Sequence, residues 1–335
     1  MSSKESAQWL SAHLYYNEPW ESFLTDAVLP YLNTTLQTGI AQKYFFIRYW
    51  ERGPHLRLRL LGRPDTLREV LYPNLCEHFG SYFERLPSER TEPEYPPQLP
   101  DDFKWHPNNS IQFIAYQPEW ERYGGAVGVA IAEETFFHSS RIVLANIAPR
   151  AKNWEYDDAL GLAIKLHLCA VHGWGMQRAE ARSFFQFFFY NWLPRAFRHP
   201  DTGDHRERET RERDTLAAFA AAFDQQRAVL IDYHEQLWGA LLAGSTFEEP
   251  LLNDWIEHQR ELAQTLRYAL QDQRFVRRPL HYQFYNTGDA VLSPLEKQCW
   301  MQYADYLHLT NNRLGVLNRD EGYLAYLMMR SMENS

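Results

Sequence analysis

Residues 43–62 contain two apolar runs around a short turn, and this pair restricts the fold more than any other feature. "KYFFIRYW" (43–50) and "HLRLRLLG" (55–62) are rich in aromatic and aliphatic residues, and "ERGP" separates them. The second run alternates with period two, so Arg57 and Arg59 project from one face while leucines fill the other. The segment is therefore predicted to be an antiparallel hairpin.

The segments around this hairpin extend it to a six-element pattern. The expected elements are a strand at 8–16, a helix at 20–38, a helix at 65–86 and a strand at 110–119. The order strand, helix, strand, strand, helix, strand is that of ferredoxin-like domains. Prolines at positions 30 and 73 are expected to bend or interrupt the two helices. Such a sheet has helices on one face and leaves the other available.

From Gly124 onward the apolar spacing is helical. Helices are expected at 126–148, 154–175, 178–197, 215–244, 247–272, 293–315 and 319–332, with a charged loop or solvated helix start at 201–214. The predicted fold class is α+β. A ferredoxin-like antiparallel sheet module (1–120) precedes a mainly helical module (121–335) that packs on it.

Composition narrows the class of protein. A hydrophobic content of 45% over 335 residues supports a sizeable core, and a net charge of -9 argues against a nucleic-acid binder held by a general positive field. Cys76, Cys169 and Cys299 lie far apart without a CxxC pair, which predicts a reducing compartment without structural zinc. Neither a signal peptide nor a run of about 18 apolar residues is evident. A cytoplasmic protein without a membrane segment is expected.

The arginine pair of 55–62 has two interpretations. Neighbours on one face of a strand lie about 6.5–7 Å apart. At this spacing, the guanidinium groups of Arg57 and Arg59 are able to bind an acidic ligand from two sides. A solvated sheet face without a ligand explains the same pattern.

A second polar segment, "YQPEWERYGG" (116–125), follows the last predicted strand. It contains Glu119 and Arg122 beside Gly124 and Gly125. Adjacent glycines allow close approach of a ligand. They serve equally well in a simple connection between a strand and a helix.

A third polar segment, "YLHLTNNRLG" (306–315), ends a predicted helix. His308 and Asn312 are four residues apart and share a face, with Asn311 nearby. Histidine is the side chain best suited to proton transfer near neutral pH. Alternatively, His308 is structural and the residues up to Gly315 form a helix C-terminal cap.

Together and in this order, the three segments resemble the C-terminal elimination domain of lantibiotic dehydratases. The same domain occurs as free-standing thiopeptide-type bacteriocin biosynthesis proteins. The resemblance covers roughly residues 8–330. In that family, a large glutamylation domain esterifies Ser or Thr of a precursor peptide with glutamate from glutamyl-tRNA. The elimination domain then expels glutamate to leave dehydroalanine or dehydrobutyrine.

The resemblance implies the site residues one by one. The catalytic residues carried over are Arg57, Arg59, Arg122 and His308. The substrate-binding residues expected beside them are Glu119, Tyr123, Asn311, Asn312 and Arg313. In this hypothesis the two strand arginines bind the glutamyl group, the third arginine supports the developing negative charge, and the histidine moves the proton.

The resemblance also implies partners and alternatives. No metal or organic cofactor is expected. The partners expected are a precursor peptide with its leader and a separate tRNA-dependent glutamylating enzyme, without direct nucleic-acid or membrane binding, and a homodimer is permitted. Some free-standing relatives are instead pyridine synthases, which join two dehydroalanines by a formal [4+2] aza-cycloaddition. A non-catalytic module that binds the peptide or the partner enzyme is the third interpretation.

Overall fold

The computed structural model describes residues 6–197, 205–272, 274–276, 279, 281–284, 287–288 and 290–333. The chain divides into two compact units. The sheet unit comprises Met1–Pro118 and Ser139–Trp154, and the helical unit comprises Glu119–His138 and Glu155–Ser335. The module boundary at residue 120 stays a prediction. Positions 201–204 of the predicted charged segment lie outside the described residues.

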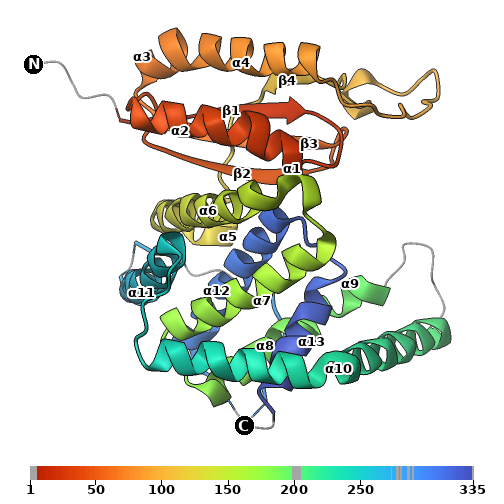
Figure 1. Cartoon of the computed structure of the whole chain (residues 1–335), viewed down its shortest axis with the longest axis vertical. Helices are drawn as coiled ribbons and strands as arrows, with labels where there is room; N and C mark the ends of the chain where they lie inside the picture. Colours follow the sequence, from red (N-terminus) through yellow and green to blue (C-terminus); the bar gives the residue numbers. More distant parts are fainter. Residues whose placement is uncertain are drawn as a thin grey trace, which may run out of the picture. The chain divides into compact units, whose positions relative to one another are not determined.

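The sheet unit contains a four-stranded antiparallel sheet (Figure 1). Its strands are β1 (Gln8–Tyr15), β2 (Lys43–Tyr49), β3 (His55–Gly62) and β4 (Ser110–Phe113). They lie in the order β2-β3-β1-β4. This order, with a helical segment after the first and third strands, is the ferredoxin-like arrangement. The predicted fold class is confirmed.

The two helical segments of the sheet unit share an unusual feature at their prolines. They consist of α1 (Glu21–Phe23), η1 (Leu24–Val28) and α2 (Leu29–Gln37), and of α3 (Pro64–Thr66), η2 (Leu67–Leu71) and α4 (Tyr72–Arg85). Both η1 and η2 are π-helical turns, and each ends two residues before a proline. A proline removes one backbone donor and crowds the carbonyl four residues earlier, and a wider turn relieves that crowding. The expected interruptions therefore take the form of π turns.

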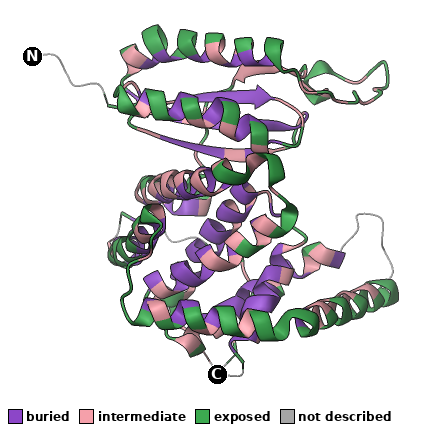
Figure 2. Ribbon diagram, in the orientation of Figure 1, coloured by how far each residue is buried: buried purple, intermediate pink, exposed green. Residues whose placement is uncertain are grey.

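The alternation of β3 fixes the two faces of the sheet. Leu58 is fully buried. It shares a face with Ala12 and, through Ala12, with Phe113, on which Tyr72 of α4 packs at 4.4 Å between ring centroids. Arg59 therefore projects from the face opposite α4. Figure 2 shows the strands as largely buried.

The fourth strand is shorter than predicted. It ends at Phe113 instead of residue 119. Beyond it, the ring of Tyr116 lies 6.0 Å from that of Trp9 and 5.8 Å from that of Phe45. This aromatic packing draws residues 114–118 out of the ladder and over the sheet face that carries Arg59. The remaining short helices of the sheet unit are η3 (Asp101–Phe103) and η4 (Ala148–Asn153).

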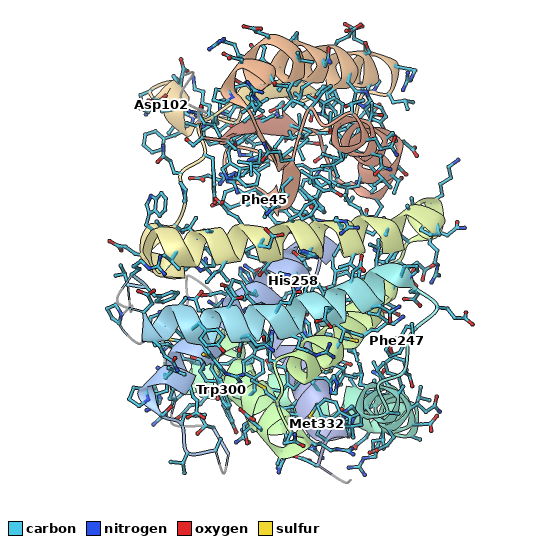
Figure 3. All side chains as sticks on the ribbon, turned by 90° about the vertical axis from the view of Figure 1, so that its left-hand side faces the viewer. Phe45, Asp102, Phe247, His258, Trp300 and Met332 are labelled. Atoms are coloured by element: carbon cyan, nitrogen blue, oxygen red, sulfur yellow. The ribbon has the colours of Figure 1, made fainter. Side chains whose placement is uncertain are left out.

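The helical unit is built from segments that mostly agree with the predicted ranges. They are α5 (Trp120–Tyr123), α6 (Gly125–Ile147) up to His138, α7 (Tyr156–Gly173), α8 (Arg178–Trp192), α9 (Pro194–Phe197), α10 (His205–Leu242), α11 (Pro250–Gln271), α12 (Pro294–Leu314) and α13 (Glu321–Ser331). Helix α13 packs against α8, and α11 packs against α7. Helix α12 is mostly buried, and its Trp300 lies among tightly packed side chains (Figure 3).

One prediction for this unit needs correction. The single helix expected at 178–197 breaks after Trp192, because Pro194 has no backbone N–H to continue the ladder. Of the two alternatives for the charged segment, a loop or a solvated helix start, residues 205–214 confirm the second, since they form the exposed start of α10. In the described part of the chain, no helix is long and apolar enough to cross a membrane.

Candidate functional site

Aromatic rings and polar partners hold both arginines of β3. The guanidinium of Arg57 lies 3.4 Å from the ring centroid of Tyr49 and donates hydrogen bonds to His55 Nε2 (3.2 Å) and Glu51 (3.3 Å). The guanidinium of Arg59 lies 5.1 Å from the ring of Phe45, whose place is labelled in Figure 3, and 4.4 Å from that of Tyr116. Their positions are therefore set by packing rather than by solvent.

The same sheet face contains two buried histidines that the sequence did not single out. His13 pairs with Arg57 across β1 and β3, and its ring stacks on that of His55 at 5.0 Å. Burial, together with the nearby positive charge of His55, Arg57 and Arg59, lowers the pKa of His13 to about 3. Burial likewise lowers the pKa of His55 to about 4. Both imidazoles are neutral near pH 7, so the positive charge of this face resides on the arginines.

In the helical unit, a buried carboxylate fixes Arg122. This arginine on α5 donates to Asp305 Oδ1 of α12 (2.9 Å) and to Glu119 (3.1 Å). Asp305 is fully buried and also accepts a hydrogen bond from the Tyr282 hydroxyl (2.8 Å). Burial works to lower the pKa of Arg122, but the carboxylates raise it beyond that effect. The guanidinium is therefore permanently charged and oriented.

A second buried carboxylate holds His308. Its Nδ1 lies 2.7 Å from Oε1 of Glu321, which is fully buried. Because a carboxylate only accepts, Nδ1 is the donor in this hydrogen bond, and Nε2 is the ring nitrogen that Glu321 does not bind. The other oxygen of Glu321 accepts from Asn311, whose side-chain oxygen lies 2.9 Å from Nε2 of His167. This chain of hydrogen bonds fixes the orientation of the imidazole.

The two carboxylate-supported groups line one cavity. It has a volume of about 660 Å³, and its lining includes Arg122, His308, Trp192 and Tyr282. Helix α12 supplies both Asp305 and His308, which are three residues apart and so share a face. A cation and a polarised imidazole beside one cavity suit a reaction that removes a proton and builds negative charge.

The structure distributes the predicted catalytic residues between two groups. Arg57 and Arg59 lie together on β3 of the sheet unit, and Arg122 and His308 lie together at the cavity of the helical unit. Among the described residues, no cluster of three His, Cys, Asp or Glu side chains is arranged to hold a metal ion.

Three of the predicted substrate-binding residues are buried and contact other side chains of the chain. Tyr123 is 3% exposed and stacks on Tyr306 at 6.2 Å. Arg313 is fully buried, with its guanidinium 5.0 Å from the ring of Phe136. Asn311 is fully buried in the chain that ends on His167.

The remaining two are more accessible. Glu119 forms an ion pair with Arg122, and Asn312 is half-buried. A substrate-binding role for the five residues stays a prediction.

The glycines of the second and third polar segments have structural roles, while close approach of a ligand to them stays a prediction. Gly124 and Gly125 have φ values of 86° and 79° and connect α5 to α6. Gly315, with φ of 86°, caps α12, and its backbone N–H donates to the carbonyl oxygens of Asn311 and Asn312. A left-handed backbone at these places explains why glycine occupies them.

Sequence reasoning missed the two carboxylates that support the site. Asp305 has a signal, because it lies one helical turn before His308 on the same predicted helix. Glu321 has none, since it belongs to another helix and meets His308 only in the folded chain.

Comparison with solved structures supports the fold. The pyridine synthase TbtD from thiomuracin biosynthesis superimposes with a TM-score of 0.71 at 15% identity, covering 97% of each chain. TsrL gives 0.64 at 18% identity, covering 98% of this chain and 95% of TsrL. The tRNA-dependent lantibiotic dehydratase MibB from Microbispora sp. 107891 gives 0.56 at 16% identity, covering 99% of this chain and 28% of MibB. At these identities the likeness concerns the fold alone.

Comparison of sequences identifies the family. The subtilin biosynthesis protein SpaB of Bacillus subtilis is 27% identical over 136 residues, which are 40% of this chain and 11% of SpaB. Residues 9–332 match the family described as "Lantibiotic biosynthesis dehydratase C-term". The chain therefore belongs to the family of lantibiotic dehydratase C-terminal domains.

Proposed function

We propose that this chain is a lyase that eliminates glutamate from glutamylated Ser or Thr of a ribosomally made precursor peptide. The observation that carries the proposal is the pairing of His308 with Glu321 beside the cavity that Arg122 also lines. The products are dehydroalanine or dehydrobutyrine and free glutamate.

The reaction needs a base and a stabiliser of negative charge. Removal of the α-proton of the esterified residue forms the Cα–Cβ double bond, and the bond between Cβ and the ester oxygen breaks. His308 presents Nε2 to accept the proton, and Glu321 stabilises the resulting imidazolium. Arg122, oriented by Asp305, donates to the carbonyl oxygen on which charge develops.

The departing group is a carboxylate, which accounts for the arginine pair of β3. Planar guanidinium groups bind carboxylates through two parallel hydrogen bonds. The ring of Tyr49 holds the guanidinium of Arg57, and the rings of Phe45 and Tyr116 hold that of Arg59. Both guanidinium groups are therefore already ordered, and binding a ligand costs them little side-chain entropy. Their role in the proposal is to bind the glutamyl group.

The proposal implies two partners. One is the precursor peptide with its leader, and the other is a separate enzyme that makes the glutamyl ester from glutamyl-tRNA. MibB, a fold relative of which this chain covers 28%, is itself tRNA-dependent. The net charge of -9 argues against direct binding of the tRNA by this chain.

A second candidate is a [4+2] aza-cycloaddition between two dehydroalanines. The observation in its favour is that this chain and the pyridine synthase TbtD cover 97% of each other. Hydrogen-bond donors such as Arg122 would polarise an amide carbonyl in that reaction as well. The two candidates differ in substrate, since one takes glutamyl esters and the other takes dehydroalanines already made.

Mass spectrometry of a glutamylated Ser-containing peptide incubated with the purified chain tests the proposal. Loss of the whole glutamate, which leaves a mass one water below that of the unmodified peptide, is the expected result. An unchanged ester contradicts it, and a dehydroalanine-bearing peptide then tests the cycloaddition. If neither peptide reacts, a non-catalytic binding module becomes the better account.

A further inference from the structure

The cavity of the helical unit is lined by a further cation, Arg195, to which the proposed reaction assigns no role. Arg195 lies on α9, directly after the break at Pro194, and lines the same cavity as His308. Its guanidinium lies 4.5 Å from the ring centroid of Trp192 and donates to the carbonyl of Asn191 at 2.9 Å. These contacts orient the group while its side chain remains exposed.

The charges of the cavity single out this arginine. Arg122 is paired with Asp305 and Glu119, and the imidazole of His308 faces Glu321. Arg195 has no carboxylate partner among the described residues. An oriented guanidinium that lacks such a partner is suited to bind a carboxylate brought by a ligand.

Trp192 provides an independent observation at the same place. It lines the cavity and is 1% exposed, and its indole Nε1 is buried without an acceptor among the described residues. Its buried position makes the indole a fixed part of the cavity wall, and the guanidinium of Arg195 packs on its ring.

The position of Trp192 connects Arg195 to the reacting groups. The indole stacks on Tyr282 at 5.4 Å, and its centroid lies 5.7 Å from that of His308. The Asn191 side chain accepts from the backbone N–H of Gln283 (2.9 Å) and donates to its carbonyl (3.0 Å), which fixes the segment that carries Tyr282. A ligand group at Arg195 would therefore be held next to the base, on a preorganised wall.

We infer that Arg195 and Trp192 form a subsite for the second carboxylate of the glutamyl group. The inference rests on the proposed function. Glutamate has two carboxylates, and the one that forms when the ester bond breaks remains at the reacting centre. The other lies at the far end of the carbon chain and needs a cation of its own. Glu121 also lines the cavity, and its carboxylate would bind the amine of glutamate rather than a carboxylate.

The test compares two peptide substrates that differ only in that carboxylate, a glutamyl ester and a glutaminyl ester. Wild type is expected to prefer the glutamyl ester. Arg195→Ala is expected to lower kcat/KM for the glutamyl ester by roughly 10- to 100-fold, as for a lost charge-assisted hydrogen bond. Its kcat/KM for the glutaminyl ester should stay within about twofold of wild type. A purely structural role for Arg195 would lower both values alike.

Arg182→Ala is the matched control. It removes the same charge from neighbouring helix α8, where Arg182 pairs with Glu333 away from the cavity lining. This variant is expected to keep the preference for the glutamyl ester. Arg195→Lys, which keeps the charge and loses the planar fork, should retain part of the preference.

The outcomes separate this inference from the proposed function. Equal loss on both esters in Arg195→Ala, or no preference in wild type, overturns the subsite while elimination stands. If wild type acts on neither ester, the proposed function fails. Calorimetric titration with free glutamate and glutamine then decides the subsite. Glutamate binding that is lost in Arg195→Ala supports it, and absent or unchanged binding overturns it.

Discussion

At the scale of the residue, the orientation of the two candidate catalytic groups at the cavity is set by buried carboxylates. Arg122 depends on Asp305, and His308 depends on Glu321, and both carboxylates are fully buried. Burying a carboxylate is costly unless it is paired and hydrogen-bonded. Two buried carboxylates next to one cavity therefore indicate a functional reason for their burial. Under the proposed function, that reason is the fixed orientation of Arg122 and His308 towards the cavity.

Replacing Glu321 by Gln tests this dependence. Elimination should slow by roughly 100-fold, because the neutral amide no longer stabilises the imidazolium of His308. Single-turnover rates measured across pH give the readout. Asp320→Asn is the control, since this neighbouring carboxylate binds the Tyr156 hydroxyl and not His308. A Glu321→Gln enzyme with the wild-type rate and pH profile contradicts the assignment.

The buried histidine of β1 predicts a pH dependence of stability. The pKa of His13 is about 3 in the folded chain, below the ordinary value of 6.5, chiefly because of burial. Between these values the unfolded chain binds more protons, so the free energy of unfolding falls as the pH drops from about 6.5 towards 3. The fall attributable to His13 is at most about 1.4 kcal/mol for each pH unit.

Denaturant unfolding at pH 7 and at pH 5 measures that slope. His13→Gln should show a shallower loss of stability between the two values, because glutamine does not titrate. Ser11→Ala is the control, because Ser11 lies on the same face of β1 and neither serine nor alanine titrates in this pH range. This variant should keep the wild-type slope. An unchanged slope in His13→Gln would place the pH dependence elsewhere.

At the scale of the element, local periodicity accounts for what sequence predicted well. The strands of β2 and β3 follow from alternation and a turn, and the capped helix α12 follows from Ser293 and Pro294 at its start. What failed depends on tertiary packing. Tyr116 lies outside the strand ladder because its ring packs against that of Phe45. Glu321 contacts His308 from another helix. Neither contact leaves a trace in local spacing.

Gly124 carries a prediction at this scale, because it sets the position of α5 and thus of Arg122. Its φ is 86°, and an added Cβ would lie 2.3 Å from the ring of Phe275. Gly124→Ala should therefore lower the melting temperature and slow elimination. Gly161→Ala is the control: its Cβ meets nothing within 4 Å in the middle of α7, so it should be neutral or stabilising by about 0.5–1 kcal/mol. Calorimetry and the elimination assay together read out both variants.

At the scale of the whole molecule, the family match spans nearly the whole chain, whereas the chain matches only part of its larger relatives. The family match covers residues 9–332, whereas the chain corresponds to 28% of MibB and matches 11% of SpaB. The larger relatives therefore contain much that this chain does not match. Under the proposed function, the glutamyl ester is made by an activity outside the residues that match the family.

This division of labour has a measurable consequence. With a peptide that already carries the glutamyl ester, the rate of elimination should not change when glutamyl-tRNA is added. With an unmodified peptide and glutamyl-tRNA, the chain should give no dehydrated product until a glutamylating enzyme is supplied. Mass spectrometry of the four reactions follows both the ester and the dehydrated residue. Dehydration of the unmodified peptide by this chain alone would assign both stages to it and refute the split. Acceleration by added tRNA would instead indicate direct tRNA binding, which the net charge of -9 does not favour.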